Sequence, residues 1–313
     1  MQDVYRNVLL SISALGAKDD DGGCFFQRDP STVAPTVLRL RLEGGDGKEF
    51  MAEAETYDAW SASFVNEPLL ERSWVVQERI LAPRTLHFGT KQVFWECREK
   101  TSCETRPKSV YFLPLQRDST LHDDQAFLWK QLLDVVAEMP GDPYDPYQRI
   151  FLEWDRIVEY YTGRKLTVAS DKLPALSGLA NATRARLQKL WSGPHRYLAG
   201  LWEETLMTTL LWRLTGPRKR PSEYRAPSWS WACLDGRINN ATRFALLVDS
   251  FASMISGETV PLEKDACDTG QVNGGVLTLR GPCAHVFIDI VDDWPNEAIP
   301  PALGRGLSCV ALV

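Results

Sequence analysis

The stretch PLLERSWVVQERILAPRTLHFGTKQVFWEC, residues 68–97, carries the clearest structural signal in this chain of 313 residues. Its first half, residues 69–81, has apolar residues at the spacing of an amphipathic helix with charged residues between them. Pro83 ends this helix, because proline cannot continue the backbone hydrogen-bond ladder. The segments 85–88 and 92–97 are short and rich in aromatic and β-branched residues, and Gly89-Thr90-Lys91 separates them. We therefore predict a helix that leads into a pair of strands.

Trp74 and Glu78 lie four residues apart in the predicted helix, so the indole and the carboxylate share one face, one turn from each other. A carboxylate held beside a large apolar ring is partly desolvated, which is one way to build a catalytic carboxylate. The same spacing also fits a structural interpretation, in which Trp74 belongs to the core and Glu78 pairs with Arg72, Arg79 or Arg84. Spacing alone leaves both interpretations open.

The central stretch resembles the third signature block of the fungal heterokaryon-incompatibility (HET) domain. The resemblance rests on Arg72-Ser73-Trp74-Val75-Val76-Gln77-Glu78-Arg79, Leu81, Pro83-Arg84, Leu86-His87-Phe88-Gly89 and Trp95-Glu96-Cys97. Further segments resemble the sequences that follow this domain in such proteins: residues 164–167, 171–180, 197–202 and 224–232. The resemblance implies a fungal protein that acts in non-self recognition and programmed cell death.

HET domains have been considered distant relatives of Toll/interleukin-receptor (TIR) domains, whose NAD-cleaving members carry a glutamate on a helix in a Ser-x-Trp-x-x-x-Glu-like setting. The resemblance therefore implies an α/β fold with a partial TIR-like or flavodoxin-like sheet. It also implies Glu78 as the catalytic residue and Trp74, Arg72 and Ser73 as substrate-binding residues. NAD would be a substrate, and the resemblance implies no cofactor and no metal. Loss of nicotinamide leaves an oxocarbenium-like sugar, which one carboxylate can stabilise.

Two earlier HET blocks do not occur in this sequence, a Ser-Tyr-x-Trp-Gly-like strand end and a Trp-Ile-Asp-x-Leu-Cys-Ile-like strand. Met1 falls where the helix after the second block would begin. The resemblance thus implies an N-terminally truncated HET domain. Two alternatives to catalysis remain: a non-catalytic protein that binds or regulates a partner, and an inactive truncated remnant.

We expect three regions, a partial HET domain over residues 1–110, a helical region over 111–220 and a β-rich region over 221–313. The expected helices span residues 1–6, 147–161, 172–191 and 201–214, because their apolar residues recur with helical spacing or, for the first, because a helix fits before a buried strand at 8–15. The other expected strands span residues 36–42, 228–231, 244–248, 275–281 and 285–291.

Composition limits the classes of partner and compartment. The 35 Lys and Arg residues against 41 Asp and Glu give a formal charge of -6, which does not favour nucleic acid or an anionic membrane. Seven cysteines without repeated spacing argue for a reducing, cytoplasmic location, and four scattered histidines argue against a metal site. No run reaches the roughly 18 apolar residues that a membrane span needs. We expect a protein partner.

Overall fold

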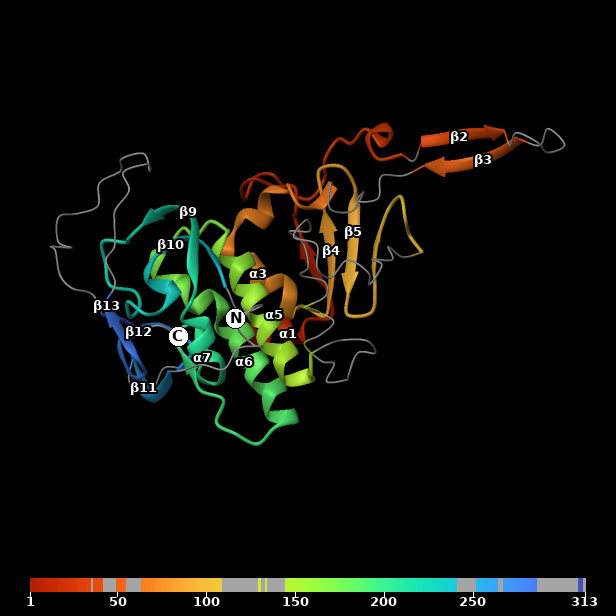
Figure 1. Ribbon diagram of the computed structural model, residues 1–313. Helices are drawn as coiled ribbons and strands as arrows, with labels where there is room; N and C mark the ends of the chain where they lie inside the picture. The colour runs from red at the N-terminus through yellow and green to blue at the C-terminus, as the bar shows by residue number, and fades with distance from the viewer. Residues whose placement is uncertain are drawn as a thin grey trace.

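The computed structural model describes residues 1–34, 36–41, 49–54, 63–108, 129–130, 133, 144–240, 252–263, 267–285 and 309–311. Within these residues the chain has mixed α/β content, with a small mixed sheet beside a group of helices (Figure 1). The predicted α/β class is confirmed at this level. The division into regions at residues 110 and 220 stays a prediction.

The four-stranded sheet has the order β1-β4-β5-β6. β1 pairs in parallel with β4, and the other two pairings are antiparallel. Alternate residues of β4 and β5 are buried, as the period of two in a strand requires, so that Thr85, His87, Phe94 and Glu96 are all buried. The strands are β1 (Ser11–Ser13), β4 (Arg84–Phe88), β5 (Val93–Cys97) and β6 (Thr101–Cys103).

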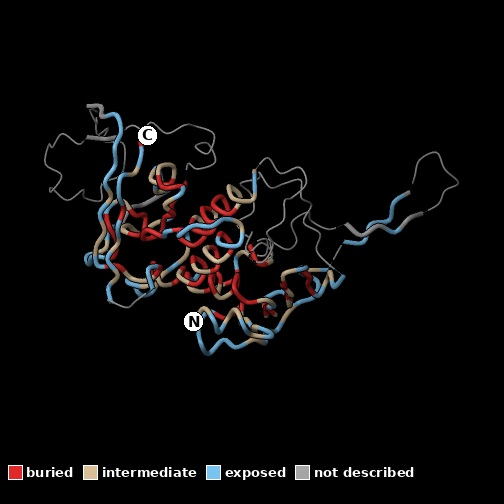
Figure 2. Tube along the Cα trace, turned by 90° about the horizontal axis from the view of Figure 1, so that it is seen from below, coloured by how far each residue is buried: buried red, intermediate tan, exposed pale blue. Residues whose placement is uncertain are grey.

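The helix α3 (Ser73–Leu81) is the last element of the connection from β1 to β4 and packs on α6 (Pro174–Leu190), α1 (Gln2–Asn7) and α5 (Pro146–Thr162). α5 begins where Asp145 caps it, its side chain accepting a hydrogen bond from the backbone N–H of Gln148 at 2.8 Å. One hydrophobic core runs through these helices, and the buried residues gather there (Figure 2). Its largest fully buried members include Trp202, Trp231, Tyr161, Tyr197 and Phe151.

The second half of the chain adds hairpins around this core. Within the described residues, β7 pairs with β8, β9 with β10, β11 with β12 and β13 with β14, all antiparallel. Their bounds, with one short helix, are β7 (Tyr197–Leu198), β8 (Leu201–Trp202), α7 (Leu206–Thr209), β9 (Arg213–Lys219), β10 (Asp235–Asn239), β11 (Ser253–Pro261), β12 (Val272–Arg280), β13 (Cys283–His285) and β14 (Cys309–Ala311). The predicted strand at 275–281 is thereby confirmed.

The hairpin of β2 (Thr36–Arg41) and β3 (Glu49–Ala54) projects from the body of the molecule (Figures 1 and 2). The predicted strand at 36–42 is confirmed here. Four of its apolar side chains are exposed: Val37, Leu38, Leu40 and Met51. We call this hairpin the arm.

The N-terminal strand is shorter and more exposed than the buried strand predicted at 8–15. Only Ser11–Ser13 is a strand, and it is an edge strand that pairs with β4 alone within the described residues. Leu9 is 81% exposed and Ile12 64% exposed, whereas Leu15 is fully buried. The prediction of a buried strand at 8–15 is therefore wrong, because nothing within the described residues covers the side chains of Leu9 and Ile12.

The helix predicted at 201–214 is wrong over most of its length. Leu201–Trp202 forms β8, only Leu206–Thr209 is α-helical, and Arg213 begins β9. Trp202 is held in the hairpin by edge-to-face contacts with Tyr197 and Trp154, whose ring centroids lie 5.2 and 5.7 Å from that of its indole. Tertiary packing of the indole therefore overrides the helical spacing of the leucines.

The strand predicted at 228–231 is also wrong. Residues 227–230 form a turn, in which the N–H of Ser230 donates a hydrogen bond to the carbonyl of Pro227. A 3-10 turn follows at Trp231–Cys233. The Ser230 hydroxyl caps this turn, and the Trp231 indole donates to the Gly200 carbonyl at 3.2 Å. The alternation of serine and tryptophan thus serves a cap and a buried anchor. The strand predicted at 244–248 and residues 286–291 of the one predicted at 285–291 lie outside the described residues.

Candidate functional site

The helix α3 begins at Ser73 because the chain before it pairs with a segment far along the sequence. Residues 69–81 were predicted as one helix, but Pro68–Glu71 is a 3-10 turn and Arg72 is extended, with φ −87° and ψ 129°. The N–H and the hydroxyl of Ser73 donate to the carbonyl of Lys165 at 2.9 and 3.0 Å, and the N–H of Lys165 donates to the carbonyl of Glu71 at 2.6 Å. The first turn of α3 is therefore fixed by the backbone of residue 165 instead of by a side-chain cap.

Trp74 is half-buried and packs against the main core. Its indole N–H donates to the carboxylate of Asp171 at 3.1 Å. The side chain predicted to form the wall of a substrate site therefore links α3 to the 3-10 turn Ala169–Lys172 that precedes α6.

Glu78 is half-buried and accepts a hydrogen bond from the hydroxyl of Tyr5 in α1. Burial raises the pKa of Glu78, and the Tyr5 hydroxyl and the positive charge of Arg72 oppose that rise. Burial, together with the neighbouring Glu78, raises the pKa of Tyr5 to about 12. Glu78 forms no salt bridge with an arginine within the described residues, and Arg72 is exposed. The catalytic role of Glu78 stays a prediction.

Gln77 is a contact residue that the sequence did not single out. Its side-chain oxygen accepts a hydrogen bond from the backbone N–H of Gly178 in α6 at 2.6 Å, and Gln77 is 2% exposed. A Cβ at Gly178 would lie 2.6 Å from that oxygen, so only glycine allows this approach. A polar residue within the apolar stripe of a predicted helix was the available signal.

The sequence also did not indicate a buried cluster of charged side chains that includes residues of β4 and β5. Glu96 accepts from Arg79 Nε at 2.7 Å, lies 3.0 Å from His87 Nε2 and lies 3.6 Å from Lys130 Nζ. All four side chains are at most 3% exposed. Although burial alone would raise it, the charges of Arg79 and Lys130 hold the pKa of Glu96 well below its usual range. Burial lowers the pKa of His87 to about 4, so His87 is neutral near neutral pH.

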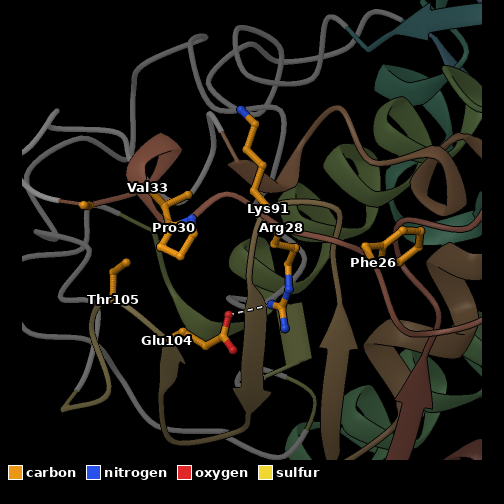
Figure 3. Close-up of a pocket in the computed structure, with 8 residues that line it drawn as sticks. Phe26, Arg28, Pro30, Val33, Lys91, Glu104 and Thr105 are labelled. Carbon is orange, nitrogen blue, oxygen red and sulfur yellow. Dashed lines mark hydrogen bonds and ion pairs between the residues drawn. The ribbon is translucent and has the colours of Figure 1, made fainter.

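A cavity of about 590 Å³ lies at the base of the arm (Figure 3). It is lined by Phe26, Arg28, Pro30, Val33, Ala34, Lys91, Glu104 and Thr105. In Figure 3 the Arg28 guanidinium points at Glu104, to which it donates at 2.6 Å, and Lys91 extends away from that pair. None of the four predicted site residues lines this cavity.

The part of the chain that the structure describes contains neither a cluster of metal-ligating side chains nor a membrane-spanning helix. No group of three histidine, cysteine, aspartate or glutamate side chains there is arranged to hold a metal ion. No helix there is long and apolar enough to cross a membrane.

Comparison with known proteins gives one match. The family model of the heterokaryon incompatibility protein (HET) matches residues 1–78, from α1 to Glu78 on α3. The chain matches no curated protein and no solved structure. The match includes Arg72, Ser73, Trp74 and Glu78, four of the residues on which the resemblance was based. Residues 1–78 of this chain are thus similar to the heterokaryon-incompatibility (HET) family.

Proposed function

We propose that this chain is a cytoplasmic fungal protein of non-self recognition and programmed cell death, and that it acts by cleaving NAD at Glu78. The HET match over residues 1–78 supports an incompatibility-type function. The observation that carries the catalytic part is the setting of Glu78. Its carboxylate is half-buried, is held by one tyrosine hydroxyl and is not neutralised by an arginine salt bridge within the described residues.

The fold gives this proposal a second support. β1 and β4 are parallel neighbours, and α3 lies in the connection between them. That arrangement is the one a TIR-like or flavodoxin-like sheet would have, and we include such a sheet in the proposal.

The chemistry requires little from the protein besides a fixed negative charge. When nicotinamide leaves, positive charge develops on the ribose, and the Glu78 carboxylate would stabilise it. Trp74 would form a wall of the site, Arg72 would bind a phosphate of NAD, and Ser73 would lie beside them at the start of α3. Arg72 is exposed and therefore accessible to a ligand.

The test is consumption of NAD by the purified chain and by Glu78→Gln. Removal of the charge should lower the rate by about 100-fold or more, the usual effect of losing a main electrostatic group. Glu71→Gln is the matched control, because Glu71 is an exposed glutamate seven positions earlier. An equal loss in both variants, or NAD consumption that Glu78→Gln retains, would exclude Glu78 as the catalytic residue.

A second candidate function is non-catalytic partner binding and regulation. The observation in its favour is that three side chains of α3 are already engaged by residues of the same chain, which is a structural and not a catalytic use of this helix. These contacts are Ser73 with Lys165, Trp74 with Asp171 and Gln77 with Gly178. A folded chain that leaves NAD intact and binds a protein partner would establish this candidate. An inactive remnant would show neither property.

A further inference from the structure

The cavity at the base of the arm lies at the carboxyl ends of the two parallel strands. Beyond the ladder of β1 and β4, the N–H of Gly16 donates to the carbonyl of Phe88, the last residue of β4, at 2.9 Å. The cavity residue Lys91 lies in the turn that follows β4, and the cavity residue Phe26 lies in the longer loop that follows β1. Open α/β sheets bind their ligands beyond the carboxyl ends of parallel strands, so this cavity has the expected place of a ligand site.

Two close approaches fix the walls of the cavity. The Phe26 ring lies against Gly16, where a Cβ would come within 2.9 Å of it. Glu67, which is 3% exposed, accepts hydrogen bonds from the N–H and the hydroxyl of Thr90, both at 2.8 Å. The turn that carries Lys91 is therefore held by a buried carboxylate, and the aromatic wall is held by a glycine.

The charges that face the cavity do not balance. Arg28 and Lys91 are cationic, and Glu104 is the one acidic residue among the described lining residues. Glu104 Oε2 already accepts from Arg28 at 2.6 Å and from the N–H of Val93 at 2.8 Å. Lys91 forms no ion pair within the described residues, although it lies close enough to the buried Glu67 to interact with its charge. One positive charge at the cavity is therefore left for a ligand.

We propose that this cavity binds a small molecule with an apolar ring or chain and one anionic group, a carboxylate or a phosphate. The volume of about 590 Å³ falls within the roughly 300–1,000 Å³ of small-molecule sites. The apolar part packs on Phe26, Pro30 and Val33, and the anionic group binds Lys91. This site is distinct from the proposed NAD site, because Glu78 does not line it.

The experiment measures binding of three probes by titration calorimetry and by ligand-observed NMR: phenyl phosphate, phenylacetate and the uncharged benzyl alcohol. Lys91→Met should weaken binding of the anionic probe by about tenfold, the usual effect of losing one charge-assisted contact. Lys100→Met is the matched control, because it removes the same charge from the turn that follows the opposite end of β5. Phe26→Leu should weaken binding through lost ring packing.

Glu104→Gln gives a test in the opposite direction. The amide oxygen can still accept from Val93, but the negative charge is lost, so the anionic probe should bind several-fold more tightly. Preference for phenyl phosphate would assign a phosphate, and preference for phenylacetate would assign a carboxylate. The proposal is overturned if neither anion binds, if benzyl alcohol binds equally well, or if Lys100→Met weakens binding as much as Lys91→Met. None of these results depends on NAD cleavage at Glu78.

Discussion

At the scale of single residues, Glu96 is the most consequential side chain of the sheet. It lies between the cations Arg79 and Lys130 with no exposure to solvent. Glu96→Gln leaves two buried positive charges without a counter-charge, which should lower the free energy of unfolding by about 3–5 kcal/mol. Urea denaturation measures this change. Glu71→Gln, which breaks the exposed pair with Lys165, should leave the free energy of unfolding nearly unchanged.

The titration of His87 should make the stability of the folded chain depend on pH. Burial lowers the pKa of His87 from 6.5 to about 4, with Glu96 opposing the shift and Arg79 and Lys130 adding to it. Between these two values the unfolded chain binds the proton and the folded chain does not. The contribution of His87 to the free energy of unfolding should therefore be fully present above pH 6.5. It should be lost on acidification to pH 4, which lowers the free energy of unfolding by roughly 3 kcal/mol.

His87→Gln removes this titration and keeps a donor for Glu96. Urea midpoints measured between pH 6.5 and pH 4 should therefore change less in the variant than in the wild-type chain. Parallel curves would show that His87 is not the responsible group.

The site residues were predictable from the sequence to an uneven degree. Ser73, Trp74 and Glu78 could be singled out because a signature block and helical spacing both point to them. Their partners Lys165, Asp171 and Tyr5 could not, because nothing in the sequence relates residues that only the tertiary structure brings together. The charge of Glu96 was likewise hidden, since a charged residue in a strand ordinarily indicates a solvent-exposed face.

At the scale of elements, the contact between α3 and α6 depends on Gly178. Gly178→Ala places a Cβ 2.6 Å from the Gln77 side-chain oxygen. The resulting overpacking should cost about 1–3 kcal/mol, against the roughly 1 kcal/mol that alanine otherwise gains over glycine in a helix. Thermal unfolding measures the difference. With Gln77→Ala in place, the same change should cost clearly less, because only the contact with Gln2 Cβ at 3.1 Å remains tight. An unchanged cost would refute the Gln77 contact as its cause.

The elements themselves were predicted where local signals agreed. α5 and α6 were found from apolar periodicity, and β4 and β5 from their short β-branched and aromatic runs. The failures at 201–214 and 228–231 have one physical cause. Trp202 and Trp231 are drawn into the core by indole packing, and the backbone around them follows.

At the scale of the whole molecule, the arm is an appendage. Its strands pair with each other, and its exposed apolar side chains include Val37 and Leu40. Replacing residues 36–54 by a short Gly-Ser linker should therefore change the free energy of unfolding by no more than about 1 kcal/mol, the scale of a change in loop length. Calorimetry of the two chains measures this. A cooperative loss of folding on excision would show that the arm supports the body.

The contacts of α3 have a consequence for protein synthesis. Its first turn is completed by Lys165 and its middle by Gly178, which lies 101 positions after Gln77. At about 5–20 residues per second, a ribosome needs roughly 5–20 s to deliver that partner. Throughout this interval the part of the apolar face of α3 that packs on α5 and α6 is uncovered in the nascent chain. Co-translational chaperones should therefore be found on this chain until α6 has left the exit tunnel.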